Sequence, residues 1–176
     1  YDFSDKDKIL LFFGNIRDYK GLDILLISLS EIKDKNVKLI IAGKPWENFG
    51  KYQNIINNLK LNNKIQSHLE FNSNEKVAEL FKLSDLIIYP YSEFEASSGA
   101  GAVALNFEKP VVVTNVGGLP ELVKDKNIIA EPNNPEDLKN KINYALKNLK
   151  RLKKDSKEIA KQYLWKEIAE KTLGVY

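Results

Sequence analysis

The sequence contains no cysteine, and this absence excludes several classes of protein. Without thiols, the chain cannot be a disulfide scaffold, use a thiolate nucleophile, or hold zinc or an iron–sulfur cluster through cysteine. Its single histidine, His68, excludes a metal site built from several histidines and disfavours a Ser-His-Asp hydrolase. His68 lies inside an apolar segment, so we expect a core or edge residue there rather than a catalytic base.

Long hydrophobic runs and a strong excess of one charge are also missing. No apolar run approaches the roughly 20 residues of a membrane-spanning helix, and no signal peptide is recognisable. The 27 Lys and Arg residues nearly balance the 24 Asp and Glu residues, and the net charge of +3 is spread along the chain. We therefore expect no nucleic-acid partner. The chain begins with Tyr1 rather than Met, so we expect residues 1–176 to be one domain of a longer protein.

Short apolar segments alternate with amphipathic ones, which is typical of a parallel sheet covered by helices. Six strands are predicted, several of them apolar on both faces, as strands buried on both faces are. They cover residues 9–13, 37–42, 65–71, 86–89, 111–114 and 128–130. The predicted fold is therefore a Rossmann-like, doubly wound α/β domain with strand order 3-2-1-4-5-6. Residues 149–173 form a terminal amphipathic helical segment, and Asn134 and Pro135 mark the start of the helix before it.

The loop after the first strand carries two cations just before a helix. Gly14 permits a tight turn, and Arg17 and Lys20 add positive charge near the free N–H groups of a helix start. This combination suits a phosphate group, although the loop matches neither GxGxxG nor the P-loop. The alternative is that both cations are ordinary solvent-facing loop residues.

The loops after the fourth and fifth strands hold carboxylates and small residues. In the first of these loops, carboxylates could bind sugar hydroxyls, and hydroxyls and N–H groups at a helix start could bind an anion. Alternatively, the small residues let the helix pack tightly. The residues concerned are Glu93, Glu95, Ser97, Ser98, Gly99 and Ala100. Gly117 and Gly118 follow the fifth strand, and all three loops are expected to meet at the switch point of the sheet.

Residues 13–23, 41–44 and 98–123 resemble the carboxyl-terminal, nucleotide-sugar-binding domain of family-4 glycosyltransferases with the two-domain GT-B architecture. The resemblance implies a retaining hexosyltransferase that uses a UDP- or GDP-sugar as substrate and transfers the sugar to a glycan, lipid or protein. It implies no protein-bound metal and no tightly bound cofactor. The acceptor would be held by a missing amino-terminal domain, so the isolated domain is expected to be inactive. The implied location is cytoplasmic, with peripheral contact at the inner face of the membrane as an option.

The same resemblance assigns roles to individual residues. Arg17 and Lys20 would hold the donor diphosphate and stabilise the leaving nucleotide, and Gly14 and residues 98–100 would let the backbone approach the phosphates. The base would lie near Gly43, Lys44 and residues 72–77.

The Glu-x7-Glu motif of this family is incomplete here. Its first position falls on Glu95, a catalytic candidate, and its second on Val103, which cannot accept a hydrogen bond. Glu93 or Glu121 could substitute, although Glu121 could equally cap a helix. Trp46, Tyr19 and Tyr91 could each cover the base or be surface aromatics. A non-catalytic nucleotide-sugar-binding module, or an epimerase or phosphorylase of the same architecture, remain alternatives.

Overall fold

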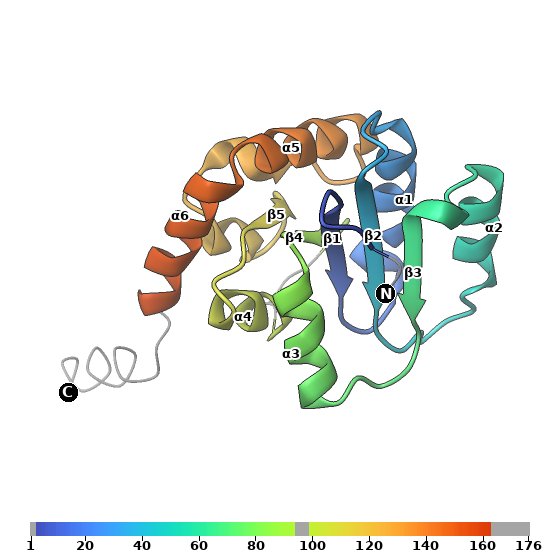
Figure 1. Ribbon diagram of the computed structural model, residues 1–176, viewed down its shortest axis with the longest axis horizontal. Coiled ribbons are helices and arrows are strands. Elements are labelled where there is room, and N and C mark those ends of the chain that lie inside the picture. Colours follow the sequence, from blue (N-terminus) through green and yellow to red (C-terminus); the bar gives the residue numbers. More distant parts are fainter. Residues whose placement is uncertain (1–2, 94–98, 163–176) are drawn as a thin grey trace.

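A computed structural model describes residues 3–93 and 99–162, which form one sheet with helices on both of its faces (Figure 1). All neighbouring strands pair in parallel, in the order β3-β2-β1-β4-β5-β6. The strands are β1 (Lys8–Phe13), β2 (Val37–Ala42), β3 (Ile65–His68), β4 (Leu86–Tyr89), β5 (Val111–Thr114) and β6 (Ile129–Ala130). The predicted Rossmann-like sheet and its strand order are therefore confirmed.

The predicted third strand is too long by three residues. β3 ends at His68, whereas the prediction extended it to Phe71. β3 is an edge strand, so it pairs only with β2, and that pairing ends at His68. Phe71 lies beyond the sheet with 87% of its surface exposed. Apolar character alone therefore gave the wrong boundary, because the segment includes a residue that the sheet does not bury.

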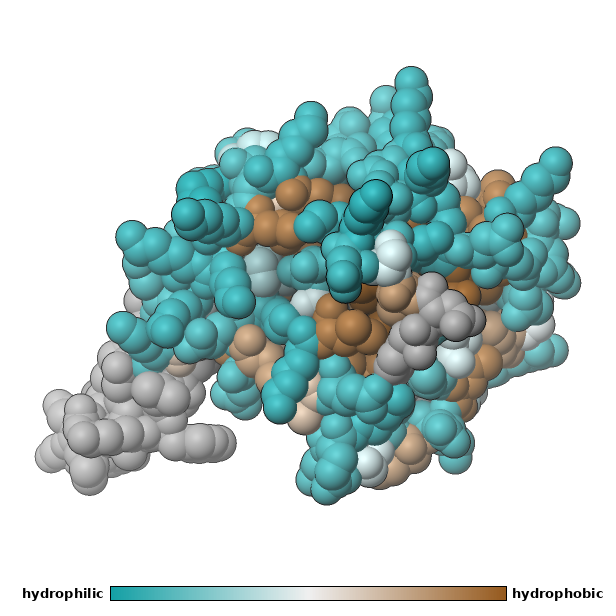
Figure 2. Space-filling view, in the orientation of Figure 1, coloured by the Kyte–Doolittle hydropathy of each residue, from teal (hydrophilic) through white to brown (hydrophobic). Residues whose placement is uncertain are grey.

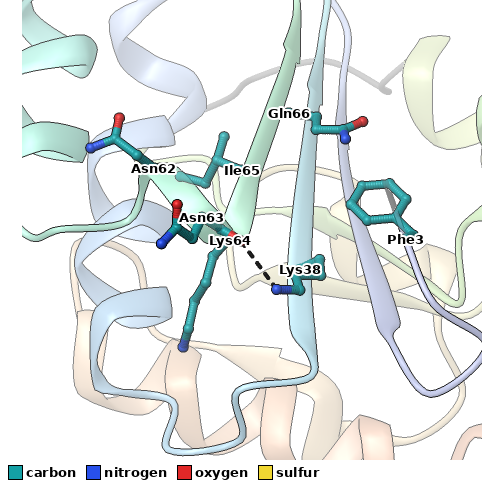
Figure 3. Close-up of a pocket in the computed structure, with 7 residues that line it drawn as sticks. All are labelled: Phe3, Lys38, Asn62, Asn63, Lys64, Ile65 and Gln66. Carbon is teal, nitrogen blue, oxygen red and sulfur yellow. Dashed lines mark hydrogen bonds between the residues drawn. The ribbon is translucent and has the colours of Figure 1, made fainter. Parts of the chain in front are cut away.

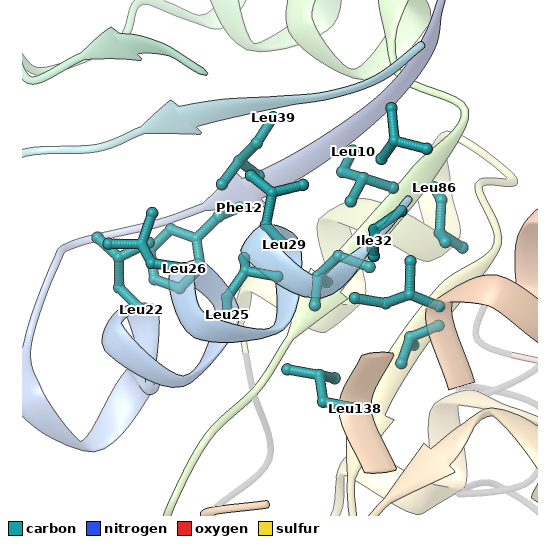
Figure 4. Close-up of a cluster of buried hydrophobic side chains, with 14 of the residues drawn as sticks. Leu10, Phe12, Leu22, Leu25, Leu26, Leu29, Ile32, Leu39, Leu86 and Leu138 are labelled. Atoms are coloured by element: carbon teal, nitrogen blue, oxygen red, sulfur yellow. The ribbon is translucent and has the colours of Figure 1, made fainter. Parts of the chain in front are cut away.

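Three helices cover one face of the sheet. They are α1 (Leu22–Glu31), α2 (Gly50–Asn58) and α5 (Pro135–Lys147). Leu22, Leu25, Leu26 and Leu29 of α1 recur at helical spacing, so they point together into this face (Figure 4). There they meet side chains of the central strands and of α5, among them Leu10, Phe12, Leu39 and Leu138.

The opposite face carries α3 (Asn74–Leu83) and α4 (Gly99–Asn106). A second apolar cluster forms here, because alternate residues of each strand point to this side. The last described helix, α6 (Leu149–Gln162), begins beside Asp85 and Pro110, just before β4 and β5, and packs against both faces. Its Leu152 packs in the first cluster and its Ile159 in the second. The predicted terminal helix is thus present over 149–162, and residues 163–173 of that prediction lie outside the described residues.

Side chains cap the starts of α3 and α5, and the start of α5 agrees with the sequence prediction. The Asn134 side chain accepts a hydrogen bond from the Asp137 backbone N–H, and Pro135 occupies the first turn of α5. Ser73 caps α3 in the same way. Hydrophilic side chains dominate the face of the molecule in Figure 2, including the surface over α6. Within residues 3–93 and 99–162, no helix is both long enough and apolar enough to cross a bilayer.

Candidate functional site

The loops after β1 and β2 are packed backbone against backbone at the carboxyl edge of the sheet. Gly14 and Gly43 both have positive φ values, +119° and +150°. A Cβ atom on Gly43 would overlap the Gly14 carbonyl oxygen, so only glycine fits there. The Gly14 N–H donates to the Ala42 carbonyl, and the Gly43 N–H donates to the His68 carbonyl. The close approach that these glycines allow is therefore first of all between the loops themselves.

Backbone pairing between these two loops continues past the ends of the strands. The Ile16 N–H donates to the Lys44 carbonyl at 3.0 Å, and the Trp46 N–H donates back to the Ile16 carbonyl at 3.0 Å. Ile16 is fully buried and anchors the pairing, whereas Lys44 is exposed. The pairing brings Trp46 to Arg17, whose guanidinium carbon lies 4.1 Å from the centre of the Trp46 ring.

A 3-10 turn, η1 (Asp18–Lys20), leads from Arg17 into α1 and buries Lys20. Gly21 ends the turn with φ +65°, and a Cβ there would overlap the Pro90 carbonyl oxygen that follows β4. The Lys20 side chain is only 9% exposed, and its ammonium nitrogen lies 5.2 Å from the centre of the Tyr91 ring. Burial, with a smaller effect of the positive charge on Arg17, lowers the pKa of Lys20 to about 8.

Neither cation has an acidic partner in the described part of the chain. The ion pairs found within residues 3–93 and 99–162 include neither Arg17 nor Lys20. Aromatic rings are their neighbours instead. An aromatic face attracts a cation without cancelling its charge. Among the residues that the structure describes, no carboxylate neutralises these two positive charges.

The loop after β4 contacts both the loop after β1 and the last residue of β5. The Ser92 N–H donates to the Tyr19 carbonyl at 2.8 Å, which ties the loop after β4 to η1. The Thr114 hydroxyl, at the end of β5, donates to the Tyr91 carbonyl at 2.7 Å. Tyr91 is 1% exposed and meets Tyr19 edge to face, with ring centres 5.9 Å apart. Tyr91 is therefore a buried support beneath Lys20, which corrects the two surface roles considered for it.

The predicted sugar-binding segment is only partly described. Glu93 is exposed at the end of the loop, and Gly99 and Ala100 begin α4. Glu95, Ser97 and Ser98 lie outside the described residues. Val103, which stands at the second position of the acidic motif, packs partly buried against the second apolar cluster.

Tight packing explains one of the small residues in α4. A Cβ on Gly101 would press on the Leu122 side chain of the 3-10 helix η3 (Leu119–Leu122), so glycine lets α4 lie close to that turn. The alternative explanation of the small residues, close helix packing, therefore holds at Gly101. Glu121 is an exposed residue in the first turn of η3, where its carboxylate suits a helix start.

His68 lies at the end of the edge strand β3, in agreement with its predicted structural role. Burial, together with the nearby positive charge of Lys76, lowers the pKa of its imidazole. Among the residues that the structure describes, no three His, Asp or Glu side chains gather closely enough to hold a metal ion.

Two cavities lie at the other edge of the sheet, where the strands begin. One, of about 290 Å³, is lined by Phe3, Lys38 and Gln66, among others (Figure 3). The Lys38 ammonium in it donates to the Asn63 carbonyl at 3.1 Å. The other, of about 210 Å³, lies between Asp85 and Lys153. Both are remote from the loops that carry Arg17 and Lys20, because those loops follow the strands rather than precede them.

Sequence reasoning named Arg17 and Lys20 but missed their surroundings. Nothing in a linear sequence indicates that Trp46 lies under Arg17 or that Tyr91 lies under Lys20. The sequence does indicate that Trp46 lies near the site, because it follows a glycine-containing turn after a buried strand.

Most of the chain is similar to known glycosyltransferases. The family described as "Glycosyl transferases group 1" matches residues 1–163. An uncharacterized glycosyltransferase of Methanocaldococcus jannaschii is 35% identical over 94% of this chain and 47% of its own length. Spore coat protein SA of Bacillus subtilis is 28% identical over 96% of this chain and 48% of its own length. The chain spans about half the length of the curated relatives it matches.

Solved structures agree with this result. A glycosyltransferase from Rickettsia africae superimposes with a TM-score of 0.80 at 26% identity, covering 98% of this chain and 48% of that one. HepE from Anabaena, solved in complex with UDP, has a TM-score of 0.82 at 23% identity and covers 97% of this chain and 50% of its own. The match over residues 1–163 shows that this chain belongs to the group 1 glycosyl transferases.

Proposed function

We propose that this chain binds the nucleotide-sugar donor of a retaining glycosyltransferase, as the carboxyl-terminal part of a longer two-domain enzyme. The observation that carries the proposal is the buried ammonium group of Lys20, beside Arg17, with no acidic partner in the part of the chain that is described. The remaining half of the enzyme would hold the acceptor, a glycan, lipid or protein. With a lipid acceptor, the enzyme would work at the inner face of the membrane.

A diphosphate is the ligand that these two cations suit best. A buried charge without a partner is costly, because the surrounding protein solvates it less well than water does. A diphosphate between Arg17 and Lys20 would supply the missing negative charge, and Arg17 could bind two of its oxygens at once. The first N–H groups of α1 lie next to Lys20, with no side-chain cap on them. They add a partial positive charge at the same place.

In the proposed reaction these charges act on the leaving group. The bond between the sugar C1 and the diphosphate oxygen breaks, and the electron pair stays with the nucleoside diphosphate. Arg17 and Lys20 stabilise that growing negative charge while the sugar passes through an oxocarbenium-like transition state. The acceptor oxygen then forms its bond to C1 on the face that the diphosphate leaves, and the acceptor hydroxyl proton passes to the released diphosphate oxygen. Glu95, Ser97 and Ser98 stay predicted contacts of the donor, together with Gly99, Ala100, Gly43, Lys44 and Glu93.

A structurally similar protein that binds UDP supports a UDP-sugar as the donor. HepE has been solved with UDP and also with UDP-glucose. A Salmonella typhimurium relative, 25% identical over 97% of this chain, is a lipopolysaccharide 1,2-N-acetylglucosaminetransferase. We therefore propose a UDP-linked hexose as the first candidate and a GDP-linked hexose as the second.

Calorimetric titration with UDP and GDP tests the site. Wild-type protein should bind one of them, and Arg17→Ala or Lys20→Met should weaken binding about tenfold or more, because each removes a charge-assisted hydrogen bond. Lys35→Met is the matched control. It removes the same charge from an exposed residue between α1 and β2, at the opposite edge of the sheet. Equal affinities for wild type and both site variants would contradict the proposal.

A non-catalytic nucleotide-sugar-binding module is the second candidate, and Val103 favours it. A valine side chain has no carboxylate to offer the ribose, and Val103 packs against the second apolar cluster instead. The full-length protein decides between the candidates when it is incubated with labelled UDP-sugar. Transfer or hydrolysis indicates a transferase, conversion of the sugar into its epimer indicates an epimerase, and binding without turnover indicates the module.

A further inference from the structure

Arg17 pairs with neither of the two carboxylates that belong to its immediate neighbours. Asp18 follows Arg17 directly, and Glu47 follows Trp46, whose ring lies 4.1 Å from the Arg17 guanidinium carbon. A carboxylate beside an arginine can form a strong, charge-assisted hydrogen bond with it. Arg17 instead stacks on the Trp46 ring.

Lys51 engages both of those carboxylates. Its ammonium group pairs with Asp18 and also lies 3.0 Å from one Glu47 carboxylate oxygen. The other Glu47 oxygen accepts a 2.6 Å hydrogen bond from the Tyr52 hydroxyl. The two acids beside Arg17 are therefore already occupied by partners from the first turn of α2.

Trp46 is an unusual residue to leave on a surface. It is 63% exposed, although burying a large aromatic side chain is strongly favourable. Its backbone is fixed, because its N–H donates to the carbonyl of the buried Ile16. The Trp46 backbone is thus anchored, and its ring can hold the long Arg17 side chain in one place.

We propose that Trp46 and Lys51 are positioning residues for Arg17: Trp46 holds the guanidinium in place, and Lys51 keeps Asp18 and Glu47 from neutralising it. This inference rests on the proposed function, in which Arg17 binds a diphosphate. Without Trp46, Arg17 would have to be ordered at the moment of binding. Without Lys51, Asp18 or Glu47 would compete with the diphosphate for Arg17.

Binding of UDP and of inorganic pyrophosphate, followed by NMR titration into the millimolar range, tests the role of Trp46. Trp46→Ala should weaken both ligands about threefold, which is the scale of an exposed cation–π contact, while Trp46→Phe keeps a ring and restores most of the affinity. In an Arg17→Ala background, Trp46→Ala should have no further effect, because the residue it positions is gone.

Other results separate this inference from the proposed function. Trp46→Ala could weaken UDP binding but not pyrophosphate binding, or weaken UDP binding equally with and without Arg17. Either result would mean that Trp46 touches the nucleotide itself, and would overturn its positioning role. Unchanged affinity in Trp46→Ala would overturn it as well. If the unaltered protein binds none of pyrophosphate, UDP and GDP, or if Arg17→Ala changes the binding of none of them, the proposed function is overturned instead.

Lys51 has its own test with the same ligands. Lys51→Met should weaken pyrophosphate binding more than Lys35→Met, which removes an equal charge far from the site. Adding Asp18→Asn and Glu47→Gln to Lys51→Met should restore the affinity, because the competing carboxylates are then gone. Equal effects of Lys51→Met and Lys35→Met would overturn this part of the inference, as would failure of the triple variant to recover. Thermal unfolding of each variant verifies that it is folded.

Discussion

The Lys20 ammonium nitrogen lies 5.2 Å from the centre of the Tyr91 ring, and the two residues come from loops that follow different strands. Tyr91 is held from two sides, by the Thr114 hydroxyl at its carbonyl oxygen and by the Tyr19 ring at its edge. Lys20 is therefore a buried cation on a rigid aromatic support. Such a group is less stable in the free protein than when an anion is bound, and this difference leads to two predictions.

Diphosphate binding should take up protons near pH 8.5. Burial and the neighbouring Arg17 lower the pKa of Lys20 to about 8, and a bound diphosphate raises it again. The contribution of Lys20 to affinity is therefore complete below pH 8 and is lost as the pH rises through the pKa of the bound state. Calorimetry of UDP binding in two buffers with different ionisation enthalpies measures the uptake. Lys20→Met should abolish it, and the same uptake in that variant would assign the proton to another group.

Lys20→Met should stabilise the fold while it weakens ligand binding. The pKa of Lys20 is lower in the folded chain than the ordinary value of 10.5, so charging this buried side chain disfavours folding. Removing the charge should raise the free energy of unfolding at pH 7 by about 1–3 kcal/mol. The advantage should shrink between pH 8 and pH 10.5, because the wild-type Lys20 is then neutral in the folded state. Urea unfolding at pH 7 and pH 10 measures this difference, and a destabilised variant at pH 7 would contradict it.

Gly21→Ala should disturb both the fold and the site. Gly21 has φ +65°, and a Cβ there would overlap the Pro90 carbonyl oxygen, so the turn that carries Lys20 must move away from the loop after β4. We expect a loss of about 2 kcal/mol or more in unfolding free energy and weaker UDP binding. Gly50→Ala is the matched control, because Gly50 has no positive φ and an added Cβ would meet only the movable Asn48 side chain. Similar melting temperatures for the two variants would refute this expectation.

Asp125 should make stability depend on pH at the acidic end. Although burial raises its pKa, hydrogen bonds from Arg151, Asn127 and Tyr144 outweigh that effect and lower the pKa of Asp125 to about 2. A carboxylate of this kind contributes stability above its unfolded pKa near 3.8, and the contribution is lost as the pH falls through 2. The Arg151 side chain is about half exposed, so we expect Asp125→Asn to cost only about 1 kcal/mol at pH 7. The wild-type advantage should fade by pH 2 in thermal unfolding scans, and an undiminished difference there would contradict this origin.

Much of the fold could be predicted from local patterns. Strands that are buried on both faces must be apolar at successive residues, so β1, β2, β4 and β5 appear in the sequence as short runs of Val, Ile, Leu and Phe. The Asn134 cap is similarly local, because its partner Asp137 is three residues away. The end of β3 was wrong because whether an apolar residue is buried depends on its neighbours in space. Phe71 has none of the sheet beside it.

The candidate site, like the fold, could be predicted from the sequence only in part. Arg17, Lys20 and the glycines of their loops were recognisable in the sequence, since charge and backbone freedom are properties of single residues. The environment of those charges could not be recognised, because residues far apart in the chain create it. Trp46 meets Arg17 only through the pairing of the loops after β1 and β2, and Tyr91 meets Lys20 only because β4 lies next to β1. Residue types along the chain thus decided the strands and the cations, whereas the order of strands in the sheet decided which groups surround each charge and therefore whether it stays available to a ligand.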